Sequence, residues 1–142
     1  MSDDYNLKDV PESMHPPLRR YAETLMEFAG TNAQSLTLFG AITTDAFNPR
    51  SHTARSVFVV GTVDLEMLKR LGQQGPRLGK ARIAAPLVMT PEYIKASMDT
   101  FPLEFLEIAQ RRICVFGEDS FGDLSLEASD VRHQCERELK TI

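Results

Sequence analysis

The hydrophobic positions of this chain change from helical spacing to strand-like runs and back, which predicts an order of helices and strands. Residues 13–30 carry apolar side chains at helical spacing behind two prolines that suit a first helical turn, and Gly30 marks the end of this helix. Residues 36–40 and 56–60 are short apolar runs joined by one loop. We expect them to form adjacent strands, because short runs connected by a single loop usually pair.

Shorter elements come after the second strand. Residues 63–72 predict a helix with Asp64 as its N-cap and one apolar face. That face carries Leu65, Leu68 and Leu71. Residues 73–80 predict a loop. Residues 81–89 predict a third strand, in which Pro86 favours an edge position or a bulge.

The last third of the chain contains one clear helix start and one ambiguous segment. Thr90 as N-cap and Pro91 as first helical residue open a helix over residues 90–98. Residues 103–109 fit both a helical and an alternating pattern, and we interpret them as a strand. Residues 129–142 predict an amphipathic helix that runs to the last residue without a stop signal. We therefore expect that a missing segment or a second copy of the chain completes it.

The length and the charge of the chain limit the number of domains and the kinds of partner that we expect. A chain of 142 residues is one domain by the usual prior, so we expect a flexible, acidic arm over residues 1–13 and a single domain over residues 14–142. The charge is mildly acidic, because 16 Lys and Arg residues against 20 Asp and Glu residues give a formal net charge of −4. Without a basic stripe, binding to nucleic acid is disfavoured.

Neither the cysteines nor the hydrophobicity indicate a metal centre, a disulfide framework or a membrane span. Cys114 and Cys135 lack CxxC spacing and companion histidines, so we interpret both as buried thiols. No apolar stretch approaches the roughly 18 residues that span a bilayer. The N-terminus is acidic where a signal peptide would be basic. We expect a cytoplasmic protein without a membrane partner.

Four segments carry a resemblance to a known superfamily. These are "LFGA" at the end of the first strand, "SVFVV" in the second, and, later, "APLVMTPEYIKASMDTFPLEFLEI" and "VFGEDSF". Through them the chain resembles nucleotidyltransferase-like domain proteins of the DNA polymerase β superfamily, in a bacterial branch of unassigned substrate, over residues 18–142. The resemblance implies an α/β (α+β) fold with a small, mixed, twisted sheet, helices mainly on one face, and further helices after the domain.

The resemblance also implies a metal site that this sequence does not complete. Members of the superfamily have a Gly-Ser pair after the first strand and an acidic pair, such as Asp-x-Asp, where the second strand begins. Two carboxylates at this spacing share one face of a strand, where they hold the magnesium ions that neutralise a triphosphate. In this chain Ala41 follows Gly40, and Ala54 and Ser56 occupy the positions of the acidic pair. We expect no metal at these two positions unless both are replaced by aspartate.

Other residues are candidates for the missing roles. Glu104 would supply the third carboxylate of the superfamily if residues 103–109 form a neighbouring strand. Asp45, in the loop after the first strand, is the second candidate acid, although aspartate is also common in turns. Glycine at the end of the first strand would let a backbone N–H approach a phosphate. The candidate nucleotide-binding residues are Gly40, Ala41, Ser51, Thr53 and Ser56.

Three functions are compatible with this pattern. The first is a nucleotidyltransferase-fold protein that is catalytically inactive or impaired and keeps a weak nucleotide-binding or a partner-binding role. The second is an active transferase that moves a nucleoside monophosphate from a nucleoside triphosphate to a small molecule or protein, with magnesium as cofactor. The third is an interaction module of a larger assembly, completed by missing C-terminal helices or by a second copy.

Overall fold

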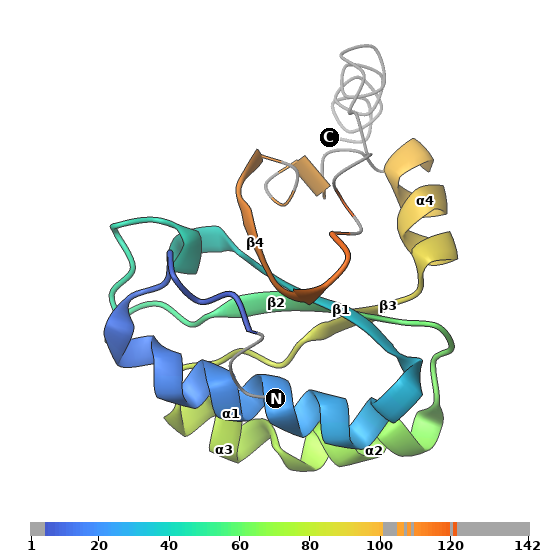
Figure 1. The fold of residues 1–142 in the computed structure, drawn as a ribbon, viewed down its shortest axis with the longest axis horizontal. Coiled ribbons are helices and arrows are strands. Elements are labelled where there is room, and N and C mark those ends of the chain that lie inside the picture. The colour runs from blue at the N-terminus through green and yellow to red at the C-terminus, as the bar shows by residue number, and fades with distance from the viewer. Residues whose placement is uncertain (1–4, 101–104, 107, 109, 120, 122–142) are drawn as a thin grey trace, which may run out of the picture.

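The protein is built from a mixed sheet with helices on both faces (Figure 1). The computed structural model describes residues 5–100, 105–106, 108, 110–119 and 121. The strands are β1 (Ala33–Phe39), β2 (Arg55–Val60), β3 (Leu87–Met89) and β4 (Arg112–Gly117). The longer helices are α1 (His15–Ala29), α2 (Leu65–Gln73), α3 (Gly75–Lys80) and α4 (Pro91–Thr100). Short 3-10 turns cover Glu12–Met14, Gly30–Asn32 and Gly40–Thr43.

The strands have the order β3-β2-β1-β4 across the sheet. Strand β1 is antiparallel to both β2 and β4, and Leu38 lies opposite Ser56 on one side and Ile113 on the other. Strands β2 and β3 are parallel and are connected through α2 and α3, as a parallel pair requires a crossover. This confirms that residues 36–40 and 56–60 contribute to adjacent strands. The edge position that Pro86 favours for the third strand is also confirmed.

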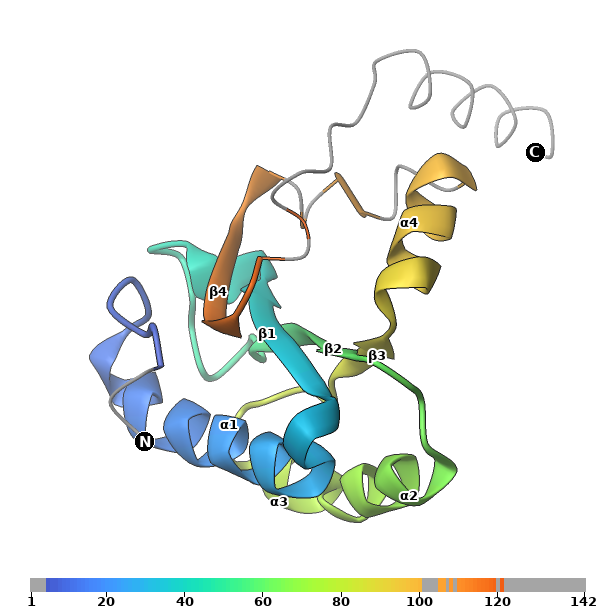
Figure 2. The ribbon, with the colours of Figure 1, turned by 45° about the vertical axis from the view of Figure 1, so that its right-hand side comes forward.

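Each face of the sheet packs against its own helical layer, because side chains alternate along a strand. On one face, β1 and β2 pack against α1, α2 and α3, and this first layer lies below the sheet in Figures 1 and 2. The sheet residues of this face include Leu36, Leu38, Phe58 and Val60. On the other face, Phe39, Val57 and Val59 pack against Ile94 and Met98 of α4. The expected α+β class, with a small mixed sheet flanked by helices, is confirmed.

The helix ends reflect the chemistry of their sequences. The backbone N–H of Tyr93 donates to Thr90 Oγ1 over 3.1 Å, and that of Glu66 donates to Asp64 Oδ1 over 2.9 Å, so both predicted N-caps are confirmed. Helix α1 has proline in its first turn and ends before Gly30, whose φ of 56° suits glycine. Within the described residues, none of the helices has the length and apolar character that crossing a bilayer requires.

The N-terminal segment packs on the sheet. Leu7 and Val10 are buried in the same core as α1. The backbone N–H of Asn6 donates to the carbonyl oxygen of Val115 in β4 over 2.8 Å. The arm expected over residues 1–13 is therefore anchored over its described part, residues 5–13.

Two expectations for the last third of the chain need correction. The strand predicted over residues 103–109 is wrong, because Phe105, Leu106 and Ile108 are helical. Phe105 and Ile108 are three positions apart and both enter the second core, so the helical period of this ambiguous run prevailed. The strand beside β1 is instead β4, which begins at Arg112. The predicted helix over residues 129–142 and Cys135 lie outside the described residues.

The region between β2 and β3 differs from expectation in three details. Helix α3 occupies most of the predicted loop at residues 73–80, with a proline in its first turn. In α2, Met67 and Leu71 are the buried side chains, whereas Leu65 is 76% exposed because it is the first residue of the helix and points away from the sheet layer. Strand β3 is shorter than residues 81–89, although an isolated bridge between Ala54 and Ile83 extends its alignment with β2.

Candidate functional site

A tight turn closes the end of β1 at the place where the resemblance expects a phosphate. Gly40 has a φ of 82°, a value that a residue with a side chain adopts only with strain. The hydroxyl of Thr43 donates to the Gly40 carbonyl over 2.7 Å, and that of Thr44 donates to the Ala41 carbonyl over 2.8 Å. Both hydroxyl hydrogens are thus used within the turn.

Hydrogen bonds between Asn48 and residues 51–52 stabilise the loop that leads to β2. The backbone N–H of Asn48 donates to His52 Nδ1 over 3.0 Å, which requires a ring whose Nδ1 carries no hydrogen. The N–H groups of Ser51 and His52 donate in turn to the Asn48 carbonyl. The side chains of Ser51 and Thr53 are exposed, so this loop presents them to solvent.

The beginning of β2 directs the two acidic-pair positions into the core. Ala54 is fully buried in the first core, beneath the layer of α1, α2 and α3. Ser56 is 1% exposed, and its hydroxyl lies 2.7 Å from the hydroxyl of Tyr21 in α1. Ser56, expected as a nucleotide-binding residue, is therefore engaged by α1 and does not share a surface with Gly40.

The opposite face of the same strands carries cations. Phe39 lies between Arg55 on β2 and Arg112 on β4 in the strand registers, so the three side chains share a face. The guanidinium of Arg55 stacks 4.5 Å above the Phe39 ring. Arg112 Nε donates to both carboxylate oxygens of Asp119, over 2.8 and 2.9 Å. No pattern in the sequence indicated this pair, whose members are seven positions apart.

These residues do not fit a magnesium ion. Magnesium takes hard oxygen ligands, usually one or two carboxylates with phosphates and water. At the start of β2, Ala54 and Ser56 face one side and Arg55 and Val57 face the other, so neither face presents a carboxylate. Within the part of the chain that the structure describes, no group of three His, Cys, Asp or Glu side chains could hold a metal ion. Glu104, the candidate third carboxylate, lies outside the described residues.

Asp45 lines a cavity of about 450 Å³ between the turn after β1 and the start of β4. Asp9 lines the same cavity, together with Arg111 and Arg112. Asp45 is exposed, and its cavity carries acids and bases in equal number from separate segments of the chain. No sequence spacing indicated that Asp9, from the N-terminal segment, lies near Asp45.

The buried pair of Tyr21 and Ser56 should contribute measurably to stability. Replacing Tyr21 with phenylalanine removes one hydroxyl and leaves Ser56 without its partner in the core, which should lower the free energy of unfolding by about 1 to 2 kcal/mol at neutral pH. Urea unfolding of the variant and of the native protein measures this difference. Tyr93→Phe is the control, because Tyr93 is 58% exposed and its loss of a hydroxyl should cost almost nothing.

Because of the same buried pair, we expect the stability of the protein to decrease at alkaline pH. Burial raises the pKa of Tyr21 above its ordinary value of 10.0, and the hydrogen bond with Ser56 opposes this rise only in part. Above pH 10 the unfolded phenol loses its proton while the folded one keeps it, so the native protein loses stability by up to about 1.4 kcal/mol per pH unit. The difference in the free energy of unfolding between the native protein and Tyr21→Phe should therefore shrink as the pH rises above 10. A difference that stays constant to about pH 12 would contradict this explanation.

The chain matches no protein-family model and no curated protein. The identification with the nucleotidyltransferase-like superfamily thus stays a prediction that rests on the sequence segments named above. A functional assignment for this chain therefore depends on the geometry of its described residues.

Proposed function

We propose that this protein is a nucleotidyltransferase-fold protein that does not catalyse metal-dependent nucleotidyl transfer and serves as a binding module. The observation that carries the proposal is the set of side chains at the start of β2. Whichever face the superfamily's acidic pair would occupy, this chain offers Ala54 and Ser56 or Arg55 and Val57. The proposal does not depend on the exact alignment of the motif.

The neighbouring strand supports the same proposal. The resemblance implies a third carboxylate beside the acidic pair, on a strand next to β1 or β2. On β4, the residue that shares the face of Arg55 and Phe39 is Arg112. A guanidinium repels magnesium and stays charged at every working pH. Arg55 stacks on Phe39 and Arg112 is paired with Asp119, so the positions beside β1 on this face hold guanidinium groups where metal catalysis would need carboxylates.

Titrations with the four common nucleoside triphosphates test the proposal. We expect any binding to be equally strong with and without millimolar magnesium, as read by calorimetry. Incubation with α-phosphate-labelled triphosphates and a heat-treated cell extract, as a source of acceptors, should transfer no label. Binding without transfer would support a residual nucleotide site, whereas neither binding nor transfer would support a module for a macromolecular partner.

An active transferase would give a different result. Magnesium-dependent label transfer that disappears in Asp45→Asn would refute the proposal and make Asp45 a catalytic acid. Asp9→Asn is the matched control, because both aspartates line the same cavity and the two variants change the net charge equally. If both variants abolish transfer, the cavity as a whole is required, and the non-catalytic assignment fails as well.

A further inference from the structure

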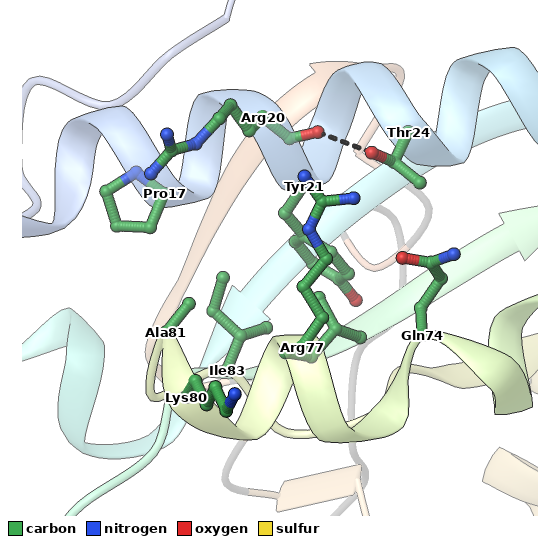
Figure 3. A pocket seen from close by; sticks show the side chains of 10 residues that line it. Pro17, Arg20, Tyr21, Thr24, Gln74, Arg77, Lys80, Ala81 and Ile83 are labelled. Carbon is green, nitrogen blue, oxygen red and sulfur yellow. Dashed lines mark hydrogen bonds between the residues drawn. The ribbon is translucent and has the colours of Figure 1, made fainter.

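A separate cavity lies in the layer of helices on the other side of the sheet, between α1 and α3 (Figure 3). Its volume is about 350 Å³, which lies within the range of small-molecule sites. Tyr21 and Ile83, 3% and 2% exposed, form its apolar floor. The amide of Gln74 at the end of α2 adds a polar group that both donates and accepts hydrogen bonds.

Three cations line this cavity from two helices. Arg20 belongs to α1, whereas Arg77 and Lys80 are three positions apart on α3 and so share a face of that helix. In Figure 3, Arg77 extends from α3 across the gap toward α1, beside Tyr21. The two helices therefore bring positive charge to one opening from opposite sides.

Among the described residues, no acid compensates these cations at the cavity. Neither aspartate nor glutamate is among the residues that line it, and none of the three cations forms an ion pair with a carboxylate of the described residues. This concentration of positive charge contrasts with the formal net charge of −4 for the whole chain. Like charges in one opening repel each other, and a bound anion would remove that repulsion.

We propose that the cavity between α1 and α3 binds a small phosphate ester, with the phosphate on Arg77, Arg20 and Lys80 and an apolar body against Tyr21 and Ile83. Guanidinium groups recognise phosphate through paired N–H donors, so arginines from two walls can hold its oxygens from two directions. The apolar floor gains nothing from inorganic phosphate but would be covered by an aliphatic or aromatic group. The site is independent of the proposed function, because it uses none of the residues at the ends of β1 and β2.

Size and surroundings favour a small ester over a polymer. A nucleic acid would need a basic track longer than this opening, and the acidic surface of the chain would repel the rest of its backbone. A single phosphate group needs only the opening between α1 and α3, where Arg77 extends across the gap and Arg20 and Lys80 also line the cavity.

Titration of the full chain with phenyl phosphate, inorganic phosphate and phenol tests the site. We expect phenyl phosphate to shift the backbone amide signals of residues 18–24, 74–75 and 77–83 to saturation, in nitrogen-proton correlation spectra at low salt. Inorganic phosphate and phenol should each bind more weakly than the ester. Arg77→Gln and Arg20→Gln should each raise the dissociation constant about ten-fold or more, since each removes charge-assisted hydrogen bonds.

Two neighbouring arginines provide matched controls. Arg19→Gln in α1 and Arg70→Gln in α2 change the net charge by the same amount, and neither residue lines the cavity. All four arginines are exposed, so the variants should fold, and equal melting temperatures verify this. Equal weakening in all four variants, shifts at other residues, or the lack of saturable binding would each overturn the site. Inorganic phosphate binding as tightly as phenyl phosphate would overturn the assignment of an ester.

Discussion

Exchanging Ala54 for aspartate should destabilise the protein by about 4 kcal/mol or more, because an unpaired carboxylate would be placed in the core beneath α1. Ala54 is fully buried, and its neighbours there include Leu18 and Ile83 within one apolar cluster. A loss of this size is a large part of the roughly 5 to 15 kcal/mol that hold a typical domain together. Urea unfolding followed by circular dichroism measures it.

Magnesium should not restore the stability of Ala54→Asp, nor of the double variant that also carries Ser56→Asp. The sequence alone suggested that this double change would create a magnesium site, but both side chains point into the first core and away from solvent. Thr53→Asp is the control, because Thr53 precedes Ala54 and is exposed. A double variant that melts at a higher temperature with millimolar magnesium would show that these positions can reach an open site.

Replacing Gly117 with alanine should cost about 3 to 5 kcal/mol and disturb the pairing of β4 with β1. Gly117 has a φ of 78°, which disfavours any residue with a Cβ. The added Cβ would overlap the carbonyl oxygen of Gln34 and would lie 2.8 Å from the Cα of Ser35, so the backbone itself would have to move. Native-state hydrogen exchange at β4 and urea unfolding measure the two effects.

Gly72→Ala is the matched control for that substitution. Gly72 lies within α2, and a Cβ there meets nothing within 4 Å. Alanine should therefore stabilise the protein by about 0.5 to 1 kcal/mol, through its better helix propensity. If both alanine variants had the same stability, neither the backbone conformation of Gly117 nor its close approach to β1 would matter.

Local sequence signals predicted the parts of the fold that depend on local chemistry. The caps at Asp64 and Thr90, the glycine end of α1 and the pairing of β1 with β2 all arise from short-range patterns. Such patterns did not predict the elements after Met98. The sequence of residues 103–109 fits a helical and an alternating period equally well, and only the packing of Phe105 and Ile108 in the second core selects the helical one. Strand β4 was missed for a different reason, since its partner β1 lies far away in the sequence and no single loop connects the two.

The candidate site was harder to predict than the fold. The sequence indicated that the start of β2 lacks an acidic pair, and it identified Gly40 as a special backbone position. It did not indicate which face Ser56 occupies, because a shift of one residue reverses every side chain of a strand. It also could not bring Arg20 to Arg77, since their proximity depends on how α1 and α3 pack on the same sheet.

The anchoring of the N-terminal segment on β4 has a consequence for how the chain is made. The side-chain amide of Asn6 donates to the carbonyl oxygen of Cys114, which is 108 residues away in the sequence. At synthesis rates of roughly 5 to 20 residues per second, Asn6 leaves the ribosome several seconds before β4, its hydrogen-bonding partner, exists. The hydrogen bonds that anchor this segment on β4 therefore form only after most of the described fold has been synthesised.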